Sequence, residues 1–159
     1  MATTQQQLIA DHRTDAEVYS ADAVLCHGKS IELLSEIRLP KGLLPLDDIV
    51  EVGYNRSKSF VWLKQRKPKT HKFRSTGKTV SYDSVITAFV EDRRMKRVTG
   101  VKSKELFLWV NISDIFVKED HPDRITFANP SGISREFPFE AFELEEEEEG
   151  GKKEGKGKR

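Results

Sequence analysis

Residues 23–30, AVLCHGKS, contain the spacing that comes closest to a recognised chemical motif. A phosphate-binding loop has the pattern G-x-x-x-x-G-K-[ST], and Gly28, Lys29 and Ser30 match its end. Ala23 stands where the first glycine is required. Such a loop follows a buried strand and opens a helix, so that free backbone N–H groups can bind phosphate. Here the segment lies inside a helical pattern that no strand-like pattern precedes, and we predict no nucleotide site.

Side chains that bind metals or act as nucleophiles are scattered along the chain. None of the histidines has the spacing of a metal-ligand pair: they are His12, His27, His71 and His121. No G-x-S-x-G motif indicates an esterase, although a Ser, a His and an acid brought together by the fold stay open. The single cysteine, Cys26, excludes an internal disulfide, fits a reducing compartment and is expected to be packed. We predict neither a metal nor a cofactor.

Basic side chains are concentrated in two runs without acids, residues 56–78 and 93–104, although Lys+Arg (27) nearly balance Asp+Glu (26) overall. If the two runs meet on one side of the sheet, they form a patch that attracts anionic lipid or nucleic acid. The candidate anion-binding rim comprises Lys64, Arg66, Lys67, Lys72, Arg74, Arg93 and Arg94. Alternatively, these cations only keep strand edges soluble and unpaired. The strands lack the aromatic pattern of RNA-binding sheets, so nucleic acid is not an expected partner.

One amphipathic helix must come first among the elements that position these residues. Residues 1–13 are polar and expected to be loose, whereas 14–39 have helical periodicity that Pro40 and Gly42 end. The predicted apolar face comprises Val24, Gly28, Ile31, Leu34 and Ile37. Gly28 on this face would allow close packing rather than bind phosphate.

A period of two replaces the helical period after residue 45, which predicts strands. The segments are a hairpin over 50–64 with its turn at 55–58, a strand over 80–90, a long strand over 105–119, and a closing pair, 123–130 and 132–142. The fold class is α+β, mainly β, with the helix packed against or inside a curled, barrel-like antiparallel sheet.

The predicted strand over 105–119 is apolar on both faces, which is typical of a strand covered on both sides. It contributes to an elongated apolar space whose candidate lining is Phe60, Trp62, Phe107, Trp109, Val110 and Ile112. The same side chains can instead fill a closed core, because small barrels fill their interior with side chains. Both interpretations stay open at this stage.

The remaining segments set the domain organisation. Residues 14–142 are expected to form a single domain, and the charged segment 143–159, ELEEEEEGGKKEGKGKR, a disordered tail. Neither a signal peptide nor a membrane-spanning apolar stretch is visible, so we expect a cytoplasmic protein, with nucleus and plastid also open.

Several segments in a fixed order resemble the land-plant family called domain of unknown function 538. They are LPKGLLP (39–45), VGYN (52–55), FVWL (60–63), VSY (80–82), TGVKSKELFLWVNISDIFV (99–117) and ITFANPSGISREFPFEAF (125–142). The resemblance implies a barrel-like sheet with an N-terminal helix, similar to lipid-binding domains of the bactericidal/permeability-increasing protein group. It also implies a link to stress responses and, as a further suggestion, hydrolysis of chlorophyll-like esters. Gln65-Arg66-Lys67 stand where many members have a cysteine, and the chain resembles an intracellular branch.

Three function classes follow from the residues and the resemblance together. The first is a non-catalytic module that binds a lipid or another amphiphile, with an anionic head at the basic rim. The second is an adaptor that binds a protein partner through its basic surface and charged tail. The third is an esterase-like hydrolase, for which no catalytic residue can be named.

Overall fold

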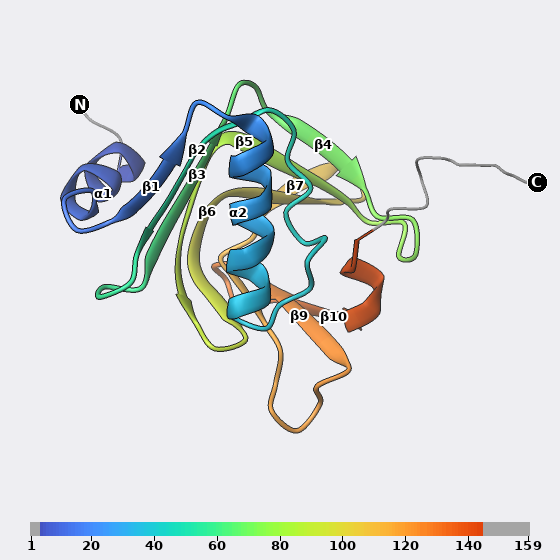
Figure 1. Cartoon of the computed structure of the whole chain (residues 1–159). Coiled ribbons are helices and arrows are strands. Elements are labelled where there is room, and N and C mark those ends of the chain that lie inside the picture. Colours follow the sequence, from blue (N-terminus) through green and yellow to red (C-terminus); the bar gives the residue numbers. More distant parts are fainter. Residues whose placement is uncertain (1–3, 145–159) are drawn as a thin grey trace, which may run out of the picture.

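A computed structural model describes residues 4–144, which form a ten-stranded antiparallel sheet with helices packed on it (Figure 1). The helices are α1 (Thr4–His12), α2 (Ala23–Glu36) and the short 3-10 helix η1 (Phe139–Phe142). The strands are β1 (Glu17–Ser20), β2 (Ile49–Asn55), β3 (Phe60–Gln65), β4 (Lys69–Lys72), β5 (Thr79–Glu91), β6 (Arg94–Glu105), β7 (Leu108–Asn111), β8 (Asp114–Phe116), β9 (Arg124–Ala128) and β10 (Ser134–Pro138).

The mainly β architecture with a helix against an antiparallel sheet is therefore confirmed. The strand order is β1-β2-β3-β5-β6-β8-β9-β10, with β4 paired to β5 and β7 paired to β6. Since β1 and β10 are the ends of this order, the sheet is not closed and a barrel is not confirmed. The charged tail predicted over 143–159 lies outside the described residues from position 145 onward.

The predicted single helix over 14–39 is wrong in its first third, which forms β1 and pairs with β2. The helix α2 begins at Ala23 because the Asp22 carboxylate caps it, accepting hydrogen bonds from the N–H groups of Val24 (3.0 Å) and Leu25 (3.1 Å). It ends at Glu36, and Arg38, two residues further on, has a left-handed φ of 63° that turns the chain away from the helix. The helical periodicity of the sequence does not indicate that the helix begins at this cap.

The buried face of α2 differs from the predicted one at two positions. Cys26, Ser30, Leu33 and Leu34 are the buried helix residues, and α2 contacts β1 and β2. Val24 and Gly28 are exposed instead, and a Cβ at Gly28 would meet no atom within 4 Å. The predicted face is therefore covered only toward the C-terminal end of the helix, at Leu34 and Ile37.

The N-terminal segment expected to be loose forms α1 instead. Its Ile9 side chain is buried against Phe60 and Trp62, in a cluster separate from the main core. The Gln5 side-chain amide donates hydrogen bonds to Val85 O (2.9 Å) and Thr99 Oγ1 (2.8 Å). Few apolar residues and several long-range polar contacts hold α1, so hydrophobic periodicity could not predict it.

The two helices lie on opposite faces of the sheet. Along β3, Phe60 and Trp62 belong to the α1 cluster, whereas Val61 and Leu63 belong to the main core that includes α2. Alternate side chains of a strand point to opposite faces, which explains this division. Figure 1 shows the sheet curving around α2, with α1 at its outer side.

A bend in the middle of β5 and β6 produces this curvature. The register between the two strands shifts between Tyr82 and Thr87. Opposite the shift, Gly100 has a φ of 86°, and an added Cβ would lie 2.3 Å from Val85 O. Glycine is therefore required where the two backbones approach most closely.

Hairpins were the best predicted part of the sheet. The hairpin β2–β3 has Asn55 opposite Phe60, and β9 pairs with β10, both as expected. The predicted long strand over 105–119 is wrong: Leu106 and Phe107 form a turn between β6 and β7. An apolar run suggested a strand covered on both sides, but its first half is a hairpin that projects from the domain.

Candidate ligand pocket

An apolar pocket of about 130 Å³ opens between the β5–β6–β7 side of the sheet and the β9–β10 hairpin. The strand register builds its floor, because Val80 lies opposite Ser103, and Ser103 lies opposite Val110. Its apolar lining consists of Val80, Val110, Ile112, Phe127, Ile133, Phe137 and Phe142. Its polar lining consists of Lys78, Ser103, Glu105, Asn129 and Arg135.

Three aromatic rings form one wall of the pocket. The Phe127 ring lies 5.8 Å from Phe137 and 5.1 Å from Phe142, measured between ring centroids. Phe142, from η1, also contacts Phe73 with a centroid separation of 4.7 Å. Edge-to-face and tilted contacts of this kind hold rings in fixed positions, so the wall is preformed.

Charged side chains stand at the pocket mouth around Glu105. The Lys78 ammonium donates to Glu105 Oε2, and the Arg135 guanidinium contacts Glu105 Oε1 at 3.0 Å. Partial burial opposes the charged form of Glu105, but the hydrogen bonds from Lys78 and Arg135 outweigh it and lower the pKa of the carboxyl. The mouth therefore combines two cations and one carboxylate over an apolar interior.

The profile of the family described as "Protein of unknown function, DUF538" matches residues 30–143, which include every pocket-lining residue. The chain belongs to the DUF538 family. No curated protein and no solved structure matches the chain significantly.

The structure separates the predicted apolar lining of this DUF538 protein into three places. Val110 and Ile112 line the pocket. Phe60 and Trp62 are fully buried under α1, on the other face of the sheet. Phe107 and Trp109 are exposed on the β6–β7 hairpin. The fold therefore does not bring these side chains together around one space.

The predicted basic rim is also divided, because the two acid-free runs reach opposite ends of β5. Lys72 pairs with Thr79 at the start of this strand, and Arg94 pairs with Glu91 at its end. At about 3.3 Å per residue, these ends are up to about 40 Å apart along the strand. Arg74 follows β4 at the first end, Arg93 precedes β6 at the second, and Lys64 lies in the middle, opposite Val85. Arg66 and Lys67 lie between β3 and β4.

Acids outside the two runs accompany several of these cations. Arg66 lies 3.5 Å from Asp48, Arg93 lies 3.4 Å from Asp92, and Arg94 lies 3.4 Å from Asp114. Lys64 lies 4.0 Å from Glu51. A run without acids in the sequence is therefore not a surface without acids.

Sequence reasoning missed both cations of the actual pocket mouth. Lys78 belongs to the first acid-free run, but nothing singled it out there. Arg135 lies in β10, and only its pairing opposite Phe127 indicates its position beside the pocket. The strand pairing, which joins residues far apart in the sequence, supplies the information that local patterns lack.

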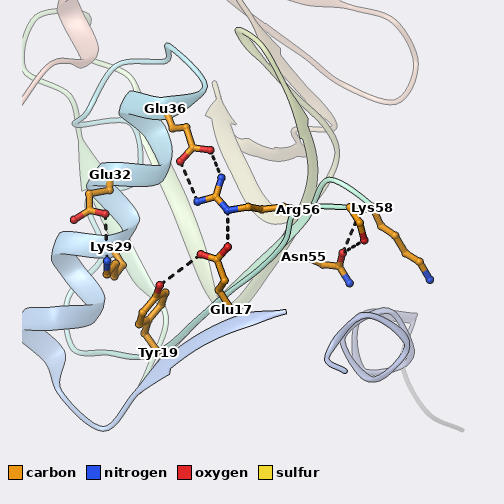
Figure 2. A network of polar contacts seen from close by, with 9 residues as sticks. Glu17, Tyr19, Lys29, Glu32, Glu36, Asn55, Arg56 and Lys58 are labelled. Atoms are coloured by element: carbon orange, nitrogen blue, oxygen red, sulfur yellow. Dashed lines mark hydrogen bonds and ion pairs between the residues drawn. The ribbon is translucent and has the colours of Figure 1, made fainter. Parts of the chain in front are cut away.

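Other conspicuous polar groups hold the domain together. Arg56 donates from Nε to Glu17 of β1 (2.5 Å) and from its terminal nitrogens to Glu36 of α2, as Figure 2 shows. These contacts raise the pKa of Arg56 further above its ordinary value. On the opposite face, the Trp62 indole donates to Glu51 Oε2 (2.7 Å), which Arg13 also contacts. We infer that the contacts of Arg56 attach α2 to the sheet and that the contacts of Glu51 attach α1.

The residues that match the phosphate-loop pattern also have a structural role. Gly28, Lys29 and Ser30 lie inside α2, where Ser30 donates to the carbonyl of His27 (2.8 Å). A strand does precede this helix, contrary to the expectation from the sequence. Only positions 21 and 22 separate β1 from α2, so the matching residues lie within the helix and not in a loop before it.

Cys26 is buried in α2 as expected, and burial raises the pKa of its thiol. In the described part of the chain, no helix is long and apolar enough to cross a membrane.

Proposed function

We propose that this DUF538 protein binds a small anionic amphiphile, with the apolar tail in the pocket and the head at its mouth. The observation that carries the proposal is the preformed apolar pocket with Lys78 and Arg135 at its opening. Binding sites for small molecules are typically concave and mostly apolar, with a few polar groups that orient the ligand.

The pocket volume sets the size of the buried portion. A cavity of about 150 Å³ accommodates a benzene molecule. The pocket, at about 130 Å³, therefore accepts a segment of roughly six carbons. Each buried CH₂ group contributes about 0.8 kcal/mol, or about a fourfold gain in affinity. Affinity should rise with chain length up to this limit and then level off.

The charges at the mouth set the preference for the head. Glu105 already accepts hydrogen bonds from Lys78 and Arg135, so an anionic head must share these donors with it. The three side chains together remain positive, which favours a carboxylate or phosphate over a trimethylammonium head. We expect a difference of about 1 kcal/mol between such heads at this partly exposed position.

Isothermal titration calorimetry with straight-chain alkyl carboxylates tests the proposal. Val110→Phe fills the pocket and should abolish binding, whereas Val18→Phe, at an exposed position of β1, is the matched control. Arg135→Gln should weaken binding, while Arg66→Gln, outside the pocket lining and beside Asp48, should leave it unchanged. Equal affinity for all chain lengths, or for Val110→Phe and the unmodified protein, would contradict the proposal.

Ester hydrolysis has less support from the same pocket. Ser103 is the hydroxyl in its lining, and this hydroxyl donates to Glu105 (3.4 Å) rather than to an imidazole. A serine nucleophile needs an adjacent base to remove its proton, and the lowered pKa of Glu105 makes this carboxylate a weak base. The contacts of Ser103 thus favour a binding role for this surface.

A further inference from the structure

The turn between β6 and β7 presents an unusual exposed apolar sequence. Four consecutive side chains are exposed there, to these fractions: Leu106 89%, Phe107 95%, Leu108 69% and Trp109 44%. Soluble proteins commonly expose single apolar residues, but contiguous apolar patches mark contacts with a partner or a membrane. This hairpin tip, residues 106–109, is not part of the pocket lining.

Both sides of the hairpin tip are uncovered. Successive strand residues point to opposite faces, so Leu108 and Trp109 face opposite sides of β7 while both remain exposed. A groove on a protein partner would cover one side of such a projection. A lipid bilayer surrounds an inserted projection on all sides, which matches the exposure observed here.

The backbone of the tip indicates that its apolar side chains are not there for stability. Leu106 has a φ of 56°, in the left-handed region that glycine and asparagine occupy at least cost. A leucine at this position is both strained and exposed to water. Strained backbone maintained at an exposed site supports a functional role for the side chain that it presents.

Positive charge lies directly behind the tip. Lys104 pairs with Trp109 across the hairpin, with its ammonium 5.7 Å from the indole ring, and Lys102 pairs with Asn111. Lys78 and Arg135 lie at the adjacent pocket mouth around Glu105, the carboxylate of this region. Tryptophan favours the membrane–water interface, and lysine near a surface is attracted to anionic lipids.

We propose that the hairpin tip inserts into the headgroup region of an anionic lipid bilayer, with Lys102 and Lys104 against the lipid phosphates. This docking goes beyond the proposed ligand binding and does not depend on it. Since Glu105 joins the tip to the pocket mouth, docking places that mouth beside the membrane surface. A pocket in this position can exchange an amphiphile with the bilayer without exposing the tail to water.

Vesicle co-sedimentation of the full chain tests the docking. We expect binding to vesicles of phosphatidylcholine that contain about 30 mol% phosphatidylserine, and much weaker binding to vesicles of phosphatidylcholine alone. Phe107→Ser should lower the affinity about tenfold or more, and Lys104→Gln about fivefold. Val24→Ser removes an apolar side chain that is 83% exposed on α2 and should change nothing. Unchanged binding of Phe107→Ser would overturn the proposal.

Leu106→Gly separates docking from folding. Glycine relieves the left-handed backbone, so this variant should melt at a higher temperature while binding vesicles more weakly. The pocket-filling variant Val110→Phe should bind vesicles normally, which distinguishes failure of the docking from failure of the pocket. Stronger vesicle binding by Leu106→Gly, or loss of vesicle binding in Val110→Phe, would contradict the assignment.

Tryptophan fluorescence reports the same event directly, because the chain has two tryptophans and Trp62 is fully buried. Trp109 should shift to the blue on vesicles and be quenched by lipids brominated near the headgroup. An unchanged spectrum would overturn the insertion. A concentration-dependent dimer that Phe107→Ser abolishes, without vesicle binding, would assign the tip to a second copy of the chain instead.

Discussion

Replacing Gly53 by alanine should destabilise the attachment of α1 to the sheet. A Cβ at Gly53 would lie 2.2 Å from ring atoms of Trp62, which pairs with Gly53 across β2 and β3. The indole lies over the glycine and donates to Glu51. It must move to accommodate the added methyl group, so the variant loses packing and a charge-assisted hydrogen bond at once.

The expected cost is the sum of two effects. Overpacking in a closely packed site costs about 1–3 kcal/mol, and loss of a hydrogen bond to a charged group costs about 1.5–3 kcal/mol. We therefore expect Gly53→Ala to lower the free energy of unfolding by about 2.5–6 kcal/mol. Urea unfolding followed by circular dichroism and tryptophan emission measures this difference.

A second glycine supplies the matched control. Gly28 is exposed within α2, and a Cβ there would meet no atom within 4 Å. Alanine is favoured over glycine in a helix interior by about 0.8–1.0 kcal/mol, so Gly28→Ala should stabilise the protein. If Gly53→Ala proved as stable as the unmodified protein, the packing of Trp62 on Gly53 would not hold α1 as described.

Three other measurements test separate parts of the fold. Asp22→Ala should cost about 1 kcal/mol of stability by removing the cap of α2, and an unchanged melting curve would contradict the cap. The folded protein lowers the pKa of Glu105 below its ordinary value of 4.5, so this carboxylate contributes stability above that pH and loses the contribution as the pH falls below it. Glu105→Gln should flatten the acid limb of the stability profile, and an identical limb would refute this role. Cys26 is buried and its pKa is raised, so a thiol reagent should react slowly until urea unfolds the chain; rapid reaction of the folded protein would show that α2 opens.

The sequence predicted those elements whose signals are local. The β2–β3 hairpin could be predicted from strands of period two around the turn at 55–58, and the β9–β10 pair from the turn at 129–132. The mainly β architecture follows from these segments. The family resemblance agrees with the profile match over residues 30–143.

Elements that depend on distant contacts could not be predicted in this way. The helix α1 is held by distant partners, Val85 through Gln5, Asn55 through the carbonyl of His12, and the Phe60–Trp62 face of β3. None of these partners alters the local sequence pattern of α1. The apolar run at 106–109 has the composition of a covered strand, yet it forms an exposed turn. Hydrophobicity predicts burial only for apolar residues that pack in the core, and residues 106–109 do not.

The candidate pocket shows the same division between local and distant information. Val110 and Ile112 were predicted from the apolar face of their strand, and they do line the pocket. The mouth required knowledge of the pairing between β9 and β10, which places Arg135 within reach of Glu105 from β6. Charge runs in the sequence instead pointed to the two ends of β5.

The most direct test of the proposed function is a titration of isotope-labelled protein with octanoate, followed by two-dimensional NMR. We predict that the backbone signals of Val80, Val110, Phe127 and Phe137 shift together, that the shifts saturate, and that Val110→Phe abolishes them. Saturating shifts centred on Phe60 and Trp62, or the absence of any shift in the pocket residues, would contradict the proposal that this pocket binds an amphiphile.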